Sequence, residues 1–193
     1  MQEDEPLILA KLTDELIVIL EGCIHGQRDA QEKLYRMFSA KMFGICLRYC
    51  KDYNEAKDIL QDGFMKVFEN IKRYEQRGSF EGWVRRIIIN TAIAKFRKSK
   101  PMILVDKVPE IIEDDNDEIE PEISLDDILK MVQQLPTRYR LVFNLYVFEQ
   151  MTHKEISEML AITEGTSKSN LSRARHILQQ RLRISTPHAL KIS

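Results

Sequence analysis

Apolar side chains recur every three or four residues along most of this chain, which is the spacing of amphipathic α-helices. A first run keeps its apolar positions on one side from Asp29, the expected N-cap, to Tyr49. The most regular stripe lies in a second run, which begins near Asn54. Its apolar members are Ala56, Ile59, Leu60, Gly63, Phe64, Val67, Phe68 and Ile71.

A third helix is expected after residues 74–79, where a glycine and several polar residues interrupt the pattern. Ser79 can cap this helix, which should run through Trp83 to about Lys98. Past Glu81 it has basic residues and no acidic one. The three helices together predict a first helical domain.

Shorter helices are expected toward the C-terminus. Apolar positions return after Ser124, stop at Pro136 and resume, which predicts two helices with a break. Thr152 and Glu155 have the Thr-x-x-Glu form of a capping box, in which each side chain satisfies a backbone N–H at a helix start. Thr163 can cap a last helix after a short turn. Two helices joined so tightly, the second rich in Lys, Ser, Asn and Arg, indicate a helix-turn-helix.

Composition adds an all-α fold class and a charge asymmetry. Seven glycines and six prolines among 193 residues are few, which favours helices over a turn-rich sheet. The net charge of −1 hides an acidic segment at 106–127, whose eleven Asp or Glu and one Lys give −10 and leave +9 elsewhere. We therefore expect two helical domains joined by an acidic flexible linker. The expected parts are an N-terminal extension at 1–24, a helical bundle at 25–100, the linker at 101–124 and the helix-turn-helix domain at 125–185.

The cysteines and the N-terminus argue against several other classes. Three cysteines without a CxxC pair are typical of reduced thiols, and Cys46 and Cys50 have the spacing of one helix face. His25 with those two thiols would lack a fourth zinc ligand, so neither a metal nor a cofactor is expected. The apolar stretch at 7–24 is broken by charges, which excludes a signal peptide and a membrane span. We expect a cytoplasmic protein that is a monomer when free.

One side of the second helix carries carboxylates. Asp58, Gln61, Asp62 and Met65 fall at i, i+3, i+4 and i+7, opposite the apolar stripe. Side chains on such a stripe splay apart instead of converging in a pocket, so acid–base catalysis is disfavoured. A solvated face or a protein-docking face is expected there.

The third helix offers a basic side. Arg86, Asn90 and Arg97 lie along it, and Trp83 lies one turn earlier. A single Trp among apolar neighbours usually belongs to a core, and we expect that first for Trp83. Stacking on the bases of single-stranded DNA is the functional alternative.

The last helix is the candidate reader of duplex DNA. The second helix of a helix-turn-helix enters the major groove, so residues pointing away from Leu171 and Ala174 would face bases. Those residues are Lys168, Ser169, Ser172 and Arg173. Lys154, Arg175 and His176 are expected at phosphates, where they add affinity without sequence information. A solvated helix face is the alternative for this set.

Three motifs together resemble the extracytoplasmic-function sigma factors of bacteria. They span residues 58–64 (DILQDGF), 80–90 (FEGWVRRIIIN) and 164–175 (EGTSKSNLSRAR). The likeness covers about residues 25 to 183, and the motifs stand in the family's order and separations. Gly63 replaces a larger residue common in the family, and Asn170 stands where Arg is frequent, which implies a weaker phosphate contact. Residues 1–24 lie outside the likeness and could form an extra helix, bind a partner or be loose.

The resemblance implies a noncatalytic initiation factor that binds core RNA polymerase and promoter DNA. In the family, the face that matches Asp58, Gln61 and Asp62 docks on the clamp helices of the polymerase's largest subunit, and the last domain meets the flap of the second-largest subunit. The bundle domain captures unpaired bases of the minus-ten element, and the last domain reads the minus-thirty-five element. The minus-ten positions are Gln76, Arg77, Ser79, Trp83, Arg86, Asn90 and Arg97. The linker would thread the RNA exit path, and an anti-sigma factor is a further expected kind of partner.

Two other classes compete with this hypothesis. A stand-alone helix-turn-helix regulator would use its first domain as a sensor, but residues 54–98 show no phosphoacceptor or ligand-pocket pattern. A nucleic-acid enzyme is disfavoured because the sequence has no Cys/His metal set, glycine-rich phosphate loop or serine-nucleophile motif.

Overall fold

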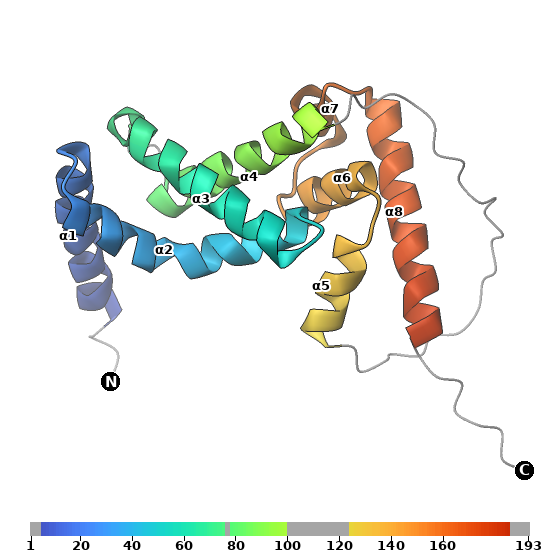
Figure 1. The fold of residues 1–193 in the computed structure, drawn as a ribbon, viewed down its shortest axis with the longest axis horizontal. Helices are drawn as coiled ribbons and strands as arrows, with labels where there is room; N and C mark the ends of the chain where they lie inside the picture. Colours follow the sequence, from blue (N-terminus) through green and yellow to red (C-terminus); the bar gives the residue numbers. More distant parts are fainter. Residues whose placement is uncertain (1–4, 76–77, 100–123, 186–193) are drawn as a thin grey trace, which may run out of the picture. The chain divides into compact units, whose positions relative to one another are not determined.

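The computed structural model describes residues 5–75, 78–99 and 124–185, and within these ranges the chain is almost entirely helical (Figure 1). The elements are α1 (Glu5–Ile24), α2 (Arg28–Tyr49), α3 (Tyr53–Asn70), the 3-10 helix η1 (Ile71–Arg73), α4 (Phe80–Ser99), α5 (Leu125–Gln133), α6 (Thr137–Val147), α7 (His153–Leu160) and α8 (Glu164–Ser185). The expected all-α class is confirmed. The acidic linker, apart from Ser124, lies outside the described residues.

By its packing the chain divides into two compact units, Met1–Ala92 and Ile93–Ser193. The core of the first unit is built by α2, α3 and α4, whose apolar stripes face one another. Leu34, Ile59, Val67 and Ile88 are completely buried there. Each such side chain stabilises the folded unit by about 1.5–3 kcal/mol relative to exposure, so this core fixes the positions of both α3 and α4.

Local capping explains where the helices of the first unit begin. Asp52 is the N-cap of α3, and its Oδ1 accepts a hydrogen bond from the Glu55 N–H at 2.8 Å. Ser79 caps the start of α4 as predicted, because its Oγ accepts from the Gly82 N–H at 3.1 Å. The prediction for Asp29 is wrong. The N-cap of α2 is Gln27, without a side-chain bond, and Asp29 lies in the first turn, where its charge still suits the positive end of the helix dipole.

Residues of the expected N-terminal extension form a helix that belongs to the first unit. Helix α1 packs on α2 and η1 and buries Ile19 and Cys23. The contact is close at Gly22, where an added Cβ would lie 2.6 Å from the Cβ of Ala30. A side chain at this position would push α1 away from α2, so glycine permits the observed approach.

The second unit contains the end of α4, from Ile93 on, and α5 to α8. Leu135, Tyr139 and Ala174 are buried at its centre, and half-buried apolar residues of α6 and α8 pack against them. Arg181 of α8 ties the end of α5 to this core, because its Nη1 donates to the carbonyl oxygen of Met131 at 2.8 Å. Such a charge-assisted bond is stronger than a neutral one and satisfies a carbonyl that helix α5 leaves open.

All three cysteines are free and buried, in keeping with the expectation of structural thiols. Burial raises the pKa of the Cys46 thiol to about 12. No three His, Cys, Asp or Glu side chains gather as metal ligands would in the part of the chain that the structure describes. None of the helices within the described ranges combines the length and apolar character that a membrane crossing requires.

Candidate functional site

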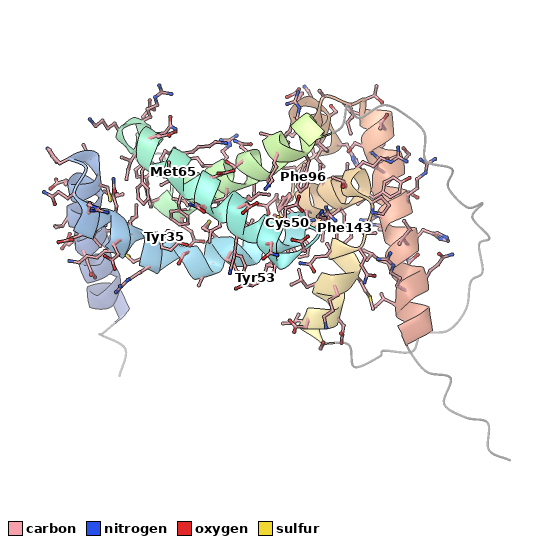
Figure 2. All side chains as sticks on the ribbon, viewed as in Figure 1. Tyr35, Cys50, Tyr53, Met65, Phe96 and Phe143 are labelled. Atoms are coloured by element: carbon pink, nitrogen blue, oxygen red, sulfur yellow. The ribbon has the colours of Figure 1, made fainter. Side chains whose placement is uncertain are left out.

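The carboxylate stripe, Asp58, Gln61, Asp62 and Met65, lies on the exposed side of α3. Met65 is 58% exposed, which is unusual for a large apolar side chain, and Figure 2 labels its place on α3. On the inner side of the same helix, an added Cβ at Gly63 would lie 2.3 Å from Cδ1 of Ile88 in α4. The stripe is therefore presented by a helix that is fixed closely against its neighbour.

The basic side of α4 is formed by Arg86, Asn90 and Arg97, which are all exposed. The one acidic residue of this helix, Glu81, forms a salt bridge of 2.6 Å with Lys41 of α2. The exposed side of α4 is thereby left with a positive character, which suits a nucleic-acid backbone.

An aromatic cluster holds the ends of the loop that precedes α4. Trp83 is half-buried, and its ring centroid lies 5.5 Å from those of both Tyr74 and Phe80. The hydroxyl of Tyr74 donates to the carbonyl oxygen of Gly78 at 2.8 Å, and Gly78 has a φ of +85° that glycine adopts readily. Trp83 thus packs in an aromatic cluster but is not among the fully buried core residues, and both core packing and base stacking stay predictions for it. The predicted DNA-binding residues 76–77 lie outside the described residues.

The predicted helix-turn-helix is formed by α7, a short turn and α8. The capping box of Thr152 and Glu155 is present as predicted, with the Thr152 N–H donating to Glu155 Oε2 at 2.8 Å. These bonds from the Thr152 backbone and hydroxyl lower the pKa of the Glu155 carboxyl. Helix α7 ends at Leu160, and its C-cap, Ala161, has the left-handed conformation. Thr163 Oγ1 then accepts a hydrogen bond from the Thr166 N–H at 3.0 Å. The turn is therefore capped on both sides.

The candidate DNA-contacting side chains lie on the outer side of this unit. Lys168, Ser169, Ser172, Lys154 and Arg175 are exposed, and Arg173 and His176 are half-buried. Asn170 is only 4% exposed and faces the interior, so it is not at a phosphate-facing position as the sequence interpretation assumed.

Sequence reasoning missed one polar contact of the helix-turn-helix. Ser167 is completely buried, and its Oγ lies 2.9 Å from Nδ1 of His153, the first residue of α7. A signal existed, because Ser167 precedes Leu171 by four and Ala174 by seven residues and so shares their inward face. The pairing with His153 has no such signal, since it joins two different helices.

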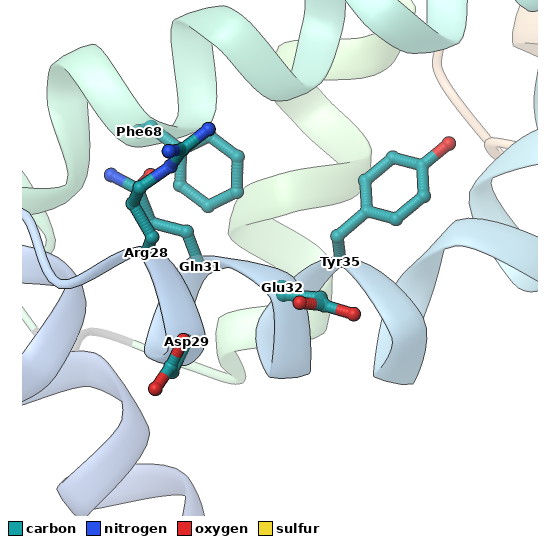
Figure 3. A pocket seen from close by; sticks show the side chains of 6 residues that line it. All are labelled: Arg28, Asp29, Gln31, Glu32, Tyr35 and Phe68. Carbon is teal, nitrogen blue, oxygen red and sulfur yellow. The ribbon is translucent and has the colours of Figure 1, made fainter.

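A shallow hollow of about 510 Å³ lies beside α2 and α3 and is lined by residues outside all of these surfaces (Figure 3). Its lining residues are Arg28, Asp29, Gln31, Glu32, Tyr35 and Phe68. The side chains are mostly charged or polar, whereas ligand pockets are usually concave and largely apolar. The exposed helix faces are therefore better candidates for the functional site than this hollow.

Two helical units, one with a capped helix-turn-helix that exposes Lys, Ser and Arg, define a helical DNA-binding protein. Comparison with known families narrows this class. Residues 34–101 match the model of Sigma-70 region 2, and residues 125–178 match that of Sigma-70 region 4.

The relatives narrow the class further. The chain is 29% identical over 171 residues to the ECF RNA polymerase sigma factor SigW of Bacillus subtilis, covering 82% of this chain and 91% of the relative. It is 26% identical over 182 residues to the RNA polymerase sigma-H factor of Pseudomonas aeruginosa, covering 85% and 92%. The chain belongs to the sigma-70 family, as a sigma factor of the extracytoplasmic-function group that directs promoter-specific transcription initiation.

A solved structure shares the fold. It is the sigma factor RpoE in complex with the anti-sigma factor NepR from Bartonella quintana, with a TM-score of 0.51 and 19% identity over 80% of this chain and 98% of that one. The membership in the sigma-70 family sets aside the stand-alone regulator, because both region 2 and region 4 are matched in one chain.

Proposed function

We propose that this sigma factor separates its tasks among three helix faces: the carboxylate stripe of α3 for core RNA polymerase, the basic side of α4 for unpaired promoter DNA, and the outer side of α8 for duplex promoter DNA. The observation that carries the proposal is the pattern of exposure. Each face lies on a helix whose opposite side is buried in a core, and its residues are exposed apart from Arg173 and His176 of α8, which are half-buried. The protein acts in this scheme by binding and positioning, without catalysis of its own.

The α3 face suits a protein partner better than a nucleic acid. Its Asp58 and Asp62 carboxylates would repel phosphates, and Met65 offers exposed apolar area beside them. The family resemblance supplies the clamp helices of the polymerase's largest subunit as that partner. Charge complementarity on such a surface mainly governs the association rate and the choice of partner.

Charge reversal tests the docking face. Asp58→Arg with Asp62→Arg should weaken binding to core polymerase by a factor of at least about 100, because like charges across an interface cost several kcal/mol. Binding is measured with labelled protein and purified core enzyme, and helix content by circular dichroism. Asp14→Arg with Glu15→Arg, two exposed carboxylates of α1, makes the same charge change elsewhere and is the matched control. Equal loss in both pairs would refute a specific docking role for α3.

The α4 face suits a single strand. Arg86 and Arg97 can contact phosphates while Asn90 offers both a donor and an acceptor to a base edge. We expect Arg86→Ala with Asn90→Ala to reduce strand opening, measured as permanganate reactivity of unpaired thymines, while core binding persists. Lys72→Ala, an exposed cation of η1, is the control. Unchanged opening in the double variant would contradict the assignment.

The α8 face suits the major groove. Lys168 and Arg173 can donate to guanine, and one good base contact is worth about 1–3 kcal/mol of discrimination. With reconstituted holoenzyme and a promoter library randomised in its upstream part, wild-type protein should select a preferred upstream sequence in run-off transcription. Arg173→Ala should relax that preference about 5- to 150-fold while core binding is kept. A preference that survives the substitution would show that α8 is not the reader.

An anti-sigma partner and the flap contact remain predictions from the family resemblance. The relative from Bartonella quintana was solved with an anti-sigma factor. Co-purification of the full chain from its native cells, followed by mass spectrometry, would test whether a protein other than polymerase subunits binds it in stoichiometric amount.

A further inference from the structure

A contact network joins α6, α7 and α8 behind the proposed reading face. His153 Nδ1 lies 2.9 Å from Ser167 Oγ. The His153 ring also stacks on the ring of Tyr146, with centroids 4.8 Å apart and planes inclined by 25°. The guanidinium carbon of Arg175 lies 5.6 Å from the centroid of the same Tyr146 ring, within cation–π range. Four side chains from three helices thus meet at one place.

Ser167 connects this network to the residues that we propose to contact DNA bases. Ser167 lies in the first turn of α8, directly before Lys168 and Ser169, which are exposed. It is completely buried, so its hydroxyl needs a partner, and His153 is within hydrogen-bond distance. A tilt of α8 about this turn would displace the proposed base-facing residues, and base contacts tolerate little displacement.

The other end of the contact is also fixed. His153 follows Thr152, the N-cap of α7, and the capping box holds that turn through Glu155. One face of its imidazole is covered by Tyr146, which limits rotation of the ring. The histidine is therefore a rigid reference point against which the first turn of α8 is held.

We propose that His153 and Tyr146 are positioning residues for promoter reading: through Ser167 they set the entry angle of α8, and through the Tyr146 ring they hold the guanidinium of Arg175. This inference rests on the proposed role of α8 as reader of duplex DNA. Neither residue itself needs to touch a base. Their effect is on how sharply the protein discriminates between sequences, because a loosened helix still binds phosphates.

The test uses reconstituted holoenzyme and two promoter duplexes: one with the upstream sequence selected by wild-type protein, one with that sequence scrambled. The readout is the ratio of the two affinities. His153→Ala and Ser167→Ala should each lower this ratio about five-fold, the change to which one net hydrogen bond corresponds. His153→Asn, which keeps a side-chain donor and acceptor, should recover most of the ratio. Tyr146→Leu should lower it, and Tyr146→Phe, which keeps the ring, should not.

A matched control separates positioning from general stability. Arg181→Ala removes a bond between α8 and α5 that lies far along α8 from Ser167, so it should lower the stability of the second unit but not the affinity ratio. Measurements are made well below the unfolding temperature of each variant. If Arg181→Ala lowers the ratio as much as Ser167→Ala, the network has only a structural role and the inference is overturned.

The positioning role of His153 and the reading role of α8 can be refuted separately. The positioning role is overturned if Arg173→Ala loses discrimination while His153→Ala and Ser167→Ala keep it. The reading role of α8 would then still stand. Unchanged discrimination in Arg173→Ala would instead overturn the proposed reading role on which this inference rests.

Discussion

The close approach of α3 to α4 at Gly63 gives a prediction whose size can be worked out. An alanine methyl at this position would lie 2.3 Å from Cδ1 of Ile88, about 1 Å short of ordinary contact. Ile88 is completely buried, so its methyl has no open space to enter. Overpacking of a core costs about 1–3 kcal/mol, and alanine returns about 1 kcal/mol of helix propensity. Gly63→Ala should therefore destabilise the first unit by about 0–2 kcal/mol.

A second substitution makes this prediction specific. Ile88→Val deletes the obstructing Cδ1 and by itself costs about 0.5–1.5 kcal/mol. In the double variant the alanine methyl occupies the space that Cδ1 leaves. The overpacking cost of Gly63→Ala and the cavity cost of Ile88→Val therefore both become smaller. We expect a favourable coupling energy of about 1–2 kcal/mol between the two sites, which is typical of residues in contact.

The assay is a double-mutant cycle by urea unfolding of the full chain. Trp83 is the only tryptophan of the sequence and lies in the first unit, so its fluorescence reports that unit alone. Gly44→Ala is the control: an added Cβ there meets nothing within 4 Å, and the variant should be more stable by up to about 1 kcal/mol. Additivity of Gly63→Ala and Ile88→Val within about 0.5 kcal/mol would refute the reasoning.

Three further predictions concern the second unit and the thiols. Arg181→Ala should lower the stability of the second unit by about 1–3 kcal/mol in urea unfolding followed by far-UV circular dichroism, and Arg181→Lys by less, because it can keep one of the bonds. The pKa of Glu155 is lowered in the folded state from 4.5, so its stabilising effect is complete above that value and is lost as the pH falls through the lowered one. Glu155→Gln should flatten this acid dependence of Tm, and an unchanged pH profile would contradict the capping role. Cys46, whose pKa is about 12, should resist thiol reagents at pH 8 until urea unfolds the chain, and rapid labelling of the native protein would contradict its burial.

The features that sequence alone predicted are those set by local rules. The caps at Ser79, Thr152 and Thr163 follow from short-range hydrogen bonding. The burial of the apolar side of α3 follows from helical periodicity. Asp29 is not the cap because Asp is favoured both at the N-cap and in the first turn. The sequence alone does not distinguish these two places, and the observed N-cap, Gln27, lies two residues earlier.

Side-chain contacts between different helices could not be predicted from the sequence, for a physical reason. The bond between His153 and Ser167 depends on the angle at which α7 meets α8, which no single helix pattern encodes. A weakened phosphate contact was expected at Asn170 because Arg is frequent there in the family, yet its place in the helical period beside Leu171 and Ala174 turns it inward. Polar residues on an apolar face are thus better assigned by their place in the helical period than by their chemistry.

The α3–α4 contact also bears on the two binding roles that we propose for the faces of α3 and α4. The carboxylate stripe and the basic side of α4 stand on adjacent helices, so whatever fixes Gly63 against Ile88 fixes both faces at once. Lys66 of α3 adds a second tie, because its Nζ donates to Thr91 Oγ1 of α4 at 3.1 Å. A change in the contact should therefore alter polymerase binding and strand opening together, whereas Asp58→Arg with Asp62→Arg should alter the first without direct effect on DNA contacts. If the two faces share one rigid support, Gly63→Ala should change polymerase binding and strand opening to a similar extent. The double variant with Ile88→Val should recover both activities together.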